Sequence, residues 1–307
     1  MRRKGIGPDG LVVVDKPAGL TSHAVVARIR KLAGTRRVGH AGTLDPMATG
    51  VLIIGVEKAT RLLGHLALTT KTYEATVRLG RSTVTDDAEG DVTATASAAG
   101  VTREALHAGV ARLTGDILQV PSKVSAIKVD GQRSHKLVRA GEEFELAPRP
   151  VTVSSFTVHA VREAVSQAAE GGHAPAGVPQ LDVDVTVECS SGTYIRALAR
   201  DLGADLGTGG HLTALRRTRV GPYAIADAAT LEGLEESFGV LPIAGAAAAT
   251  FPRWDVDAEQ ARQLVNGVRQ KAPGLGPGAI AVFDPDERFI ALVEERRGET
   301  KILAGFV

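Results

Sequence analysis

The sequence predicts an α+β protein with a mixed, largely antiparallel central sheet flanked by helices. Residues 73–79 and 181–188 alternate between apolar and polar side chains, as strands with one buried face do. Residues 101–113 instead place apolar side chains at helical spacing. Because strands and helices do not alternate strictly along the chain, a doubly wound parallel sheet is disfavoured.

The first part of the chain is predicted to form a strand, a helix, a loop, a strand and a helix. Pro17 and Gly19 close the first apolar run, and Thr21 or Ser22 can cap the helix that follows, which Gly34 ends. The expected elements, in order, are a strand at 10–16, a helix from 21 or 22 to about 32, a loop at 35–46, a strand at about 49–56 and a helix at about 58–68.

The remainder mixes strands, helices and turns. The polar stretch 81–91 and the alanine- and glycine-rich stretch 167–179 are predicted as loops, and Asp130-Gly131 marks the turn of a hairpin. The expected elements are a strand at 73–79, a helix at 101–113, a hairpin at 124–135, a strand at 151–159, a strand at 181–188, a helix at 193–206 and a strand at 212–220. Beyond residue 252 we expect a short helix at 258–266 and two strands.

The composition is that of a globular enzyme. Of the 307 residues, 44% are hydrophobic and 23% are charged. No apolar run reaches the length of a membrane span, and the first ten residues lack the apolar core of a signal peptide, so a cytoplasmic location is expected. The single cysteine, Cys189, excludes an internal disulfide and a cysteine-rich zinc site, and its strand pattern predicts a packed thiol.

The charges are unevenly distributed although the net charge is only +1. Residues 1–50 contain nine Lys or Arg against three Asp, a local excess of +6. Such a field suits a polyanion such as a nucleic acid, although part of it can be solvated helix charge. A second cluster, Arg216, Arg217 and Arg219, fits either phosphate contacts or an ordinary charge run on an edge strand.

Asp45 lies in the glycine- and proline-rich stretch 39–52, GHAGTLDPMATGVL. These residues disfavour a helix and predict a tight loop that leads into a buried strand. A carboxylate held there can act as a nucleophile, a general base or a metal ligand. It can also be an ordinary turn aspartate before proline, and the local spacing does not decide between these roles.

The same stretch resembles the nucleophile motif of the tRNA pseudouridine synthase B (TruB) family, Gly-His-x-Gly-x-Leu-Asp-Pro-x-Ala-x-Gly. Every fixed position of that motif is met, with Ala41 where threonine is frequent. Three further segments resemble the family in the expected order: LVVVDKPAGLTS (11–22), KTYEATVRLG (71–80) and CSSGTYIRALARDLG (189–203). The resemblance covers about residues 11–220.

The resemblance implies an isomerase that converts uridine 55 in the T-loop of tRNA to pseudouridine by base flipping, without a cofactor or a metal. Asp45 would attack either the uracil ring or the sugar carbon, and Arg196 would pair with that carboxylate. Tyr73 would stack on the target base, and His40 would fill the space that the flipped nucleotide leaves. From the residues alone, Tyr73 can equally be a half-buried strand tyrosine and His40 a turn residue.

Further substrate-binding positions follow from the same resemblance. Tyr194 and Leu215 match hydrophobic pocket positions, Lys16 a basic position near the pocket, and Asp87 a pocket acid. The acidic run around Asp87 can also suggest a magnesium site or a solvated loop. Candidate contacts with the RNA backbone are Arg36, Arg37, Lys123, Lys128, Arg133, Lys136, Arg216 and Arg217.

The resemblance also implies a domain plan. Residues 10–245 would form the catalytic domain, with a mobile thumb-like segment at about 121–145, and residues 250–307 a reduced, barrel-like PUA RNA-binding module. We expect a monomer that binds the T-arm of tRNA. Two alternatives remain: an RNA-binding or tRNA-folding chaperone that uses the same surface, and a magnesium-dependent phosphoryl-transfer enzyme with Asp45 as nucleophile.

Overall fold

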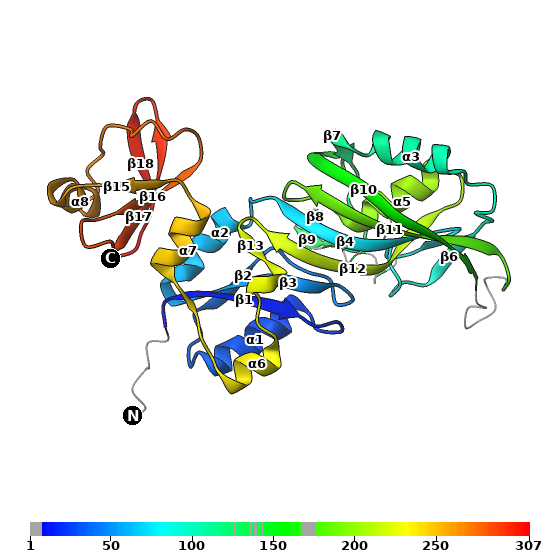
Figure 1. Cartoon of the computed structure of the whole chain (residues 1–307), viewed down its shortest axis with the longest axis horizontal. Coiled ribbons are helices and arrows are strands. Elements are labelled where there is room, and N and C mark those ends of the chain that lie inside the picture. Colours follow the sequence, from blue (N-terminus) through cyan, green and yellow to red (C-terminus); the bar gives the residue numbers. More distant parts are fainter. Residues whose placement is uncertain are drawn as a thin grey trace. The chain divides into compact units, whose positions relative to one another are not determined.

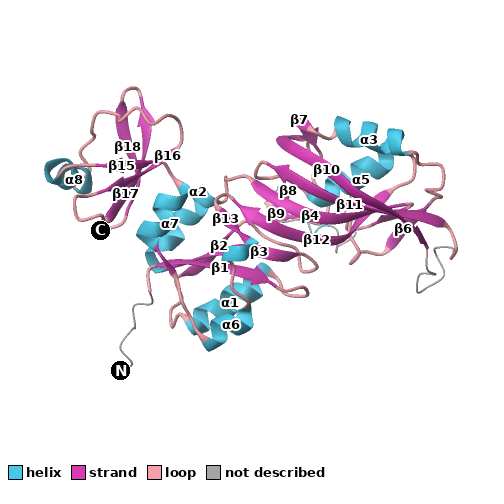
Figure 2. Cartoon of the chain, in the orientation of Figure 1, coloured by secondary structure: helices cyan, strands magenta, loops and turns pink. Residues whose placement is uncertain are grey.

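The computed structural model describes residues 8–125, 127–129, 131–134, 137, 140, 142, 144–166 and 176–307. Two compact units share the chain. The first contains residues 1–46, 50–69 and 220–307, and the second contains residues 47–49 and 70–219. Figure 1 labels the elements of both units, and Figure 2 separates their helices from their strands.

The first unit contains a small antiparallel sheet. Strand β1 (Gly10–Lys16) pairs with β3 (Thr49–Val56) from Gly10↔Val56 to Lys16↔Gly50. Strand β2 (Val38–Ala41) pairs with β3, and β14 (Leu241–Pro242) pairs with β1. The predicted strands at 10–16 and 49–56 are confirmed. The predicted loop at 35–46 is wrong in its first half, because residues 38–41 bond to β3 as a strand.

Helix α1 (Ser22–Leu32) begins as predicted, with the Thr21 side chain accepting a hydrogen bond from the Ala24 N–H. The predicted continuous helix at 58–68 is wrong: a 3₁₀ helix, η1 (Glu57–Leu62), is followed by the short α2 (Leu63–Leu66). The Thr60 hydroxyl donates to the Glu57 carbonyl and so competes with helical bonding. Further helical elements of this unit are η2 (Ile225–Asp227), α6 (Leu231–Glu236) and α7 (Ile243–Thr250), and β13 spans Tyr223–Ala224.

Residues 253–305 form a second sheet of the first unit. Its order is β15 (Arg253–Asp255), β16 (Ala279–Phe283), β17 (Phe289–Arg296) and β18 (Glu299–Gly305), with only β15 and β16 parallel. Helix α8 (Ala258–Val265) was predicted and packs Leu264 against this sheet. The Phe289 and Phe306 rings lie 4.4 Å apart in a core that also holds Leu62 and Leu66. Four strands thus stand where two were predicted.

The sheet of the second unit has the order β12-β4-β11-β10-β7. Its strands are β4 (Lys71–Leu79), β7 (Gly115–Gln119), β10 (Arg149–Val165), β11 (Pro179–Cys189) and β12 (Gly210–Val220). The pairs β4–β11, β11–β10 and β10–β7 are antiparallel, and two bulges interrupt β10–β11. The predicted α+β class with a mixed, largely antiparallel sheet is confirmed.

Helices α3 (Arg103–Arg112) and α5 (Ile195–Asp205) belong to the second unit and touch one another. The described part of this unit also contains two small hairpins: β5 (Arg81–Thr83) with β6 (Val92–Thr95), and β8 (Lys128–Val129) with β9 (Gln132–Arg133). The second confirms the hairpin predicted at 124–135. The first corrects the predicted loop at 81–91, whose ends join because the Val84 N–H donates to the Asp91 carbonyl.

The Cys189 thiol is packed as predicted, with 1% of the residue exposed. Burial raises the pKa of this thiol from 9.0 to about 11. Only the thiolate reacts with alkylating agents. Burial therefore slows the reaction in two ways: it keeps the reagent away from the sulfur, and it keeps the thiol protonated.

We expect iodoacetamide at about pH 8 to alkylate the native chain at least about 100-fold more slowly than the urea-unfolded chain. Mass spectrometry reads one site, because the chain has a single cysteine. A Cys189→Ser variant gives the background. Equal labelling rates in the two states would contradict the packed position.

Candidate active site

Asp45 lies in a short loop that buried side chains fix on both sides. The Ser22 hydroxyl, in a residue 1% exposed, accepts from the Leu44 N–H at 2.9 Å and donates to the Leu44 carbonyl at 3.1 Å. On the other side, the Pro46 carbonyl accepts from Lys16 Nζ at 3.2 Å and from the Gly19 N–H at 2.8 Å. The half-buried Asp45 therefore stands between two residues whose backbone is fixed.

Lys16 is fully buried, and backbone carbonyls surround its ammonium group. Besides Pro46, Nζ donates to the carbonyls of Pro17 at 2.9 Å and Leu20 at 2.7 Å. This ammonium group thus joins the turn after β1 to the Asp45 loop. These three bonds give Lys16 a structural role in the loop, which the resemblance to a basic position near the pocket did not predict.

His40 lies in β2, opposite Ile54 of β3, rather than in the loop where it was predicted. Its ring meets the His23 ring edge-to-face, with centroids 5.4 Å apart and planes at 81°. His23 belongs to α1, so the two imidazoles join the helix to the sheet close in sequence to Asp45. The strand gives His40 a fixed direction that a loop would not.

Tyr73 of β4 is 7% exposed and pairs with Val187 of β11. Lys71, two residues earlier and hence on the same face of the strand, is 6% exposed. Burial, and then the nearby positive charge of Arg217, lower the pKa of Lys71 to about 8. The buried face that carries Tyr73 therefore also carries cationic groups.

Arg196 lies in the first turn of α5 and is 4% exposed. Its guanidinium donates to the carbonyls of Thr85 at 2.6 Å and Val124 at 2.9 Å, and its Nε lies 3.5 Å from Asp87 Oδ2. The buried Arg196 guanidinium thus pairs with Asp87, a partner that the sequence did not predict.

Asp86 and Asp87 of the acidic turn 85–89 are buried, although residues 88 and 89 are exposed, so the solvated-loop alternative for Asp87 is wrong. Asp87 is 3% exposed, and its Oδ1 accepts from the Thr85 hydroxyl at 2.5 Å and the Glu89 N–H at 3.0 Å. Burial raises the pKa of Asp86, which lies 3.4 Å from Arg200. Within the part of the chain that the structure describes, no group of three or more His, Cys, Asp or Glu could hold a metal ion.

The remaining predicted positions divide into exposed and buried groups. Tyr194, half-buried, caps α5 with its backbone, and Leu215 of β12 is 8% exposed.

Of the candidate contacts with the RNA backbone, Arg36, Arg37 and Lys123 are exposed, as contacts with RNA phosphates require. Arg216 is half-buried and donates to the Thr49 hydroxyl at 3.2 Å. Arg217 is 1% exposed, which does not fit a solvated charge run or a surface phosphate contact. Lys136 and the side chains of Lys128 and Arg133 lie outside the described residues.

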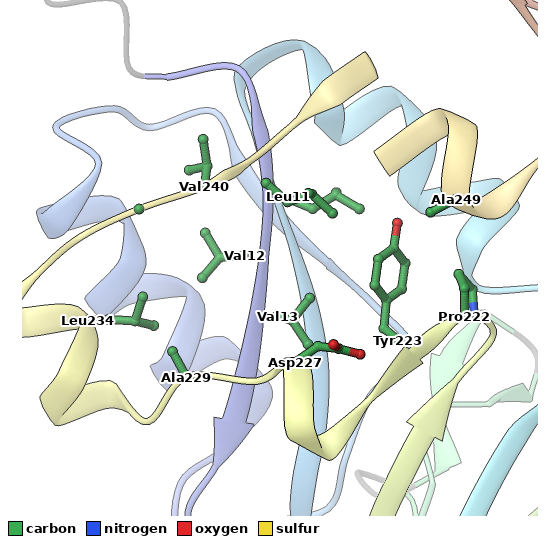
Figure 3. A pocket seen from close by; sticks show the side chains of 12 residues that line it. Leu11, Val12, Val13, Pro222, Tyr223, Asp227, Ala229, Leu234, Val240 and Ala249 are labelled. Carbon is green, nitrogen blue, oxygen red and sulfur yellow. The ribbon is translucent and has the colours of Figure 1, made fainter. Parts of the chain in front are cut away.

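Among the hollows lined by described residues of the first unit, two bear on function. Figure 3 shows one of about 450 Å³ beside β1, lined mainly by apolar groups around Tyr223 and Asp227; no predicted site residue lines it. The other, of about 600 Å³, lies on the C-terminal sheet, and four cationic side chains and one carboxylate line it: Arg269, Arg296, Arg297, Lys301 and Glu299. The first offers little polar chemistry, whereas the second suits an anion.

Two residues that hold the site backbone, Ser22 and Gln119, were not predicted to have a role in the site. Ser22 bonds to Leu44, and Gln119 bonds to both backbone polar groups of Tyr194. Ser22 ends the segment 11–22, where it was expected only as a possible helix cap, and Gln119 lies just before the expected thumb-like segment. No spacing rule in the sequence pairs them with partners 22 and 75 residues away.

No helix within the described ranges is long and apolar enough to cross a membrane.

Comparison with known families gives one consistent result. Residues 30–195 match the N-terminal domain of the TruB family of pseudouridylate synthases. Residues 196–241 match the C-terminal domain of tRNA pseudouridylate synthase B, and residues 251–307 match the C-terminal region of tRNA pseudouridine synthase II.

Similar curated proteins extend over essentially the whole chain. The tRNA pseudouridine synthase B of Streptomyces avermitilis is 64% identical, with all of both chains covered. The protein of the same name from Streptomyces coelicolor is 63% identical, again with all of both chains covered. That from Thermobifida fusca is 58% identical, covering 97% of this chain and 98% of its own.

Among solved structures, a chain of a Cbf5-Nop10-Gar1 complex is similar, with a TM-score of 0.69 and 25% identity over 100% of this chain and 90% of its own. A chain of an H/ACA RNP bound to a substrate RNA containing 2'-deoxyuridine gives a TM-score of 0.66 at 24% identity, covering 97% of this chain and 84% of its own. The second likeness concerns the fold alone.

We expect Ser22→Ala to lower the free energy of unfolding by about 1–3 kcal/mol, because it leaves the buried N–H and carbonyl of Leu44 without their partner. Urea titration followed by circular dichroism measures the change. Ser154→Ala is the matched control: Ser154 is exposed and donates one bond, to the Glu188 carbonyl, so its loss should cost less than about 0.5 kcal/mol. Equal effects of the two substitutions would contradict a structural role for Ser22.

Proposed function

Because the chain belongs to the TruB family of pseudouridylate synthases, we propose that it isomerises uridine 55 in the T-loop of tRNA to pseudouridine. Membership in this family identifies the chain as a tRNA pseudouridine synthase, which is an isomerase. Relatives that are 58–64% identical over nearly their whole length carry that name, which supports tRNA as the substrate.

The fixed loop around Asp45 is the observation that carries the catalytic part of this proposal. Asp45 acts as the nucleophile that attacks the target nucleotide. The N1–C1′ glycosidic bond breaks, a C5–C1′ bond forms, C5 loses its proton and N1 gains one, and the bond between Asp45 and the nucleotide breaks again, which restores the carboxylate; the reaction needs no redox partner. Because Leu44 and Pro46 are already hydrogen-bonded, the carboxylate reaches its reacting position with little further ordering.

Arg196, Tyr73 and His40 complete the proposed mechanism. Arg196, a buried guanidinium oriented by two carbonyls and Asp87, stabilises negative charge at the reacting centre. Tyr73, on a rigid strand, stacks on the target base and assists removal of the C5 proton. His40 fills the space that the flipped nucleotide leaves, and flipping costs about a few kcal/mol of stacking. Tyr194 and Leu215 line the base pocket.

Positive surface groups support binding of the tRNA T-arm. Arg36, Arg37 and Lys123 are exposed on the catalytic region. Arg297, in the turn between β17 and β18, has no ion pair with another described residue, whereas Arg296 pairs with Glu294. We assign the basic hollow around Arg297 to RNA phosphates.

A tRNA substrate also fits the proposed cytoplasmic location. In this proposal the enzyme acts as a monomer and without a cofactor.

We expect Asp45→Asn to lower pseudouridine formation by about 10³-fold or more while changing the affinity for a T-arm stem-loop by less than about 3-fold, because phosphate contacts dominate RNA affinity. Carbodiimide labelling maps the product, and filter binding measures the affinity. Asp116→Asn, at an exposed carboxylate, is the control and should retain full activity.

Retained conversion by Asp45→Asn would reject Asp45 as nucleophile. If wild type binds the stem-loop but makes no pseudouridine, the chaperone alternative is favoured. Full turnover on tRNA in excess chelator would count against the alternative of magnesium-dependent phosphoryl transfer.

We expect Arg297→Ala to weaken tRNA binding and to reduce the slope of log Kd against log salt by about 0.7–0.9, the loss of one phosphate contact. Arg288→Ala is the matched control in another turn of the same sheet, since Arg288 is already paired with Asp284 and Asp286. A slope unchanged by Arg297→Ala would remove this hollow from the RNA interface.

A further inference from the structure

Gln119, the last residue of β7, pairs its side-chain amide with the backbone of Tyr194. Its Nε2 donates to the Tyr194 carbonyl at 3.0 Å, and its Oε1 accepts from the Tyr194 N–H at 2.8 Å. Gln119 is 2% exposed, so water does not compete for these bonds. One primary amide therefore matches both backbone polar groups of one residue, as a neighbouring strand would.

Tyr194 is the N-cap residue of α5, and its side chain makes no capping hydrogen bond. A helix usually begins at a Ser, Thr, Asp or Asn whose side chain accepts from the first turn. Here Gln119, the last residue of strand β7, instead fixes the N-cap residue Tyr194 by hydrogen bonds to its backbone. Because residues 195–199 are all buried, the start of α5 cannot shift without disturbing its packing.

Arg196 follows Tyr194 by two residues, so the backbone that Gln119 holds also sets the direction of the Arg196 side chain. Its guanidinium reaches the carbonyls of Thr85 and Val124, which lie on two different loops. A small rotation of the first turn of α5 would therefore break the hydrogen bonds of Arg196 to both loops. Fixing the backbone of Tyr194 therefore keeps the Tyr194 and Arg196 side chains in constant positions relative to each other.

We infer that Gln119 is a positioning residue for the isomerisation: it touches no substrate and acts by holding Tyr194 and the first turn of α5. The inference rests on the proposed function, which gives Tyr194 and Arg196 their roles at the base. Loss of its two hydrogen bonds should slow the chemical step more than it weakens RNA binding, since binding depends mainly on phosphate contacts.

Gln180 provides a matched control within the same unit. It lies in β11 and is 1% exposed, like Gln119, but neither its amide nitrogen nor its amide oxygen has a hydrogen-bond partner among the described residues. Replacing either glutamine by methionine changes a buried side chain to an apolar one of similar shape. Only at Gln119 does the change remove hydrogen bonds to the backbone of a site residue.

The experiment measures single-turnover pseudouridine formation with enzyme in excess over an unmodified T-arm stem-loop. Wild type, Gln119→Met, Gln119→Glu and Gln180→Met are compared over a range of enzyme concentrations. Each titration gives a maximal rate and a half-saturating concentration. Partial unfolding would raise the half-saturating concentration and leave the maximal rate unchanged, so the maximal rate separates positioning from a merely structural role.

We expect Gln119→Met to lower the maximal rate about 10- to 100-fold with a half-saturating concentration within about 3-fold of wild type. Gln180→Met should stay within about 2-fold of wild type in both.

The Gln119→Glu variant tests the hydrogen-bond pattern itself. A protonated carboxyl group donates and accepts as the amide does, whereas the carboxylate only accepts. Burial raises the pKa of such a carboxyl group, so the rate relative to wild type should recover as the pH falls from about 8 to about 6.

A maximal rate of Gln119→Met within about 2-fold of wild type, or an equal loss in Gln180→Met, would overturn the inference. So would an effect confined to the half-saturating concentration. If Gln119→Met does not fold, Gln119→Glu decides, and a rate ratio independent of pH overturns the inference. Absence of product with wild type would overturn the proposed function and the inference together, whereas the other outcomes leave the proposed function intact.

Discussion

The backbone of the Asp45 loop is held by side chains that are themselves buried, and the rest of the candidate site depends on this constraint. A glycine-rich loop gains much conformational freedom when it is released, so an aspartate in it would ordinarily sample many positions. Ser22 and Lys16 remove that freedom at Leu44 and Pro46. Strand β1 supplies the lysine and helix α1 the serine, which links the order of the loop to the fold of the first unit.

In the second unit, ion pairs and hydrogen bonds to charged groups hold the backbone at the start of α5. Arg196 and Arg200 lie in α5, where a low dielectric makes an uncompensated charge costly. Asp87 and Asp86, from one turn, compensate them, and backbone carbonyls of residues 85, 120 and 124 take the remaining guanidinium donors. The same contacts that satisfy the charges therefore tie two loops to the start of one helix. Gln119 adds a neutral constraint to the same place.

Regular elements with a clear pattern were predicted well. Strands 10–16 and 49–56 and helix 22–32 match, because their apolar periodicity and their caps act locally. The errors lie where distant partners decide the backbone. His40 is extended because β3 bonds to residues 38–41, and residues 81–83 and 92–95 pair across the turn that holds the buried Asp86 and Asp87. Neither pairing leaves a local signal.

The sequence by itself determined the family, the α+β class and the candidate reacting residues, because a long motif and the alternation of apolar side chains are properties of the chain alone. Only the tertiary structure decided what each side chain bonds to. It placed Lys16 among carbonyls, paired Arg196 with Asp87, and revealed Ser22 and Gln119 as the residues that hold the site backbone. Hydrogen bonds between residues tens of positions apart depend on packing in three dimensions, which no local spacing encodes.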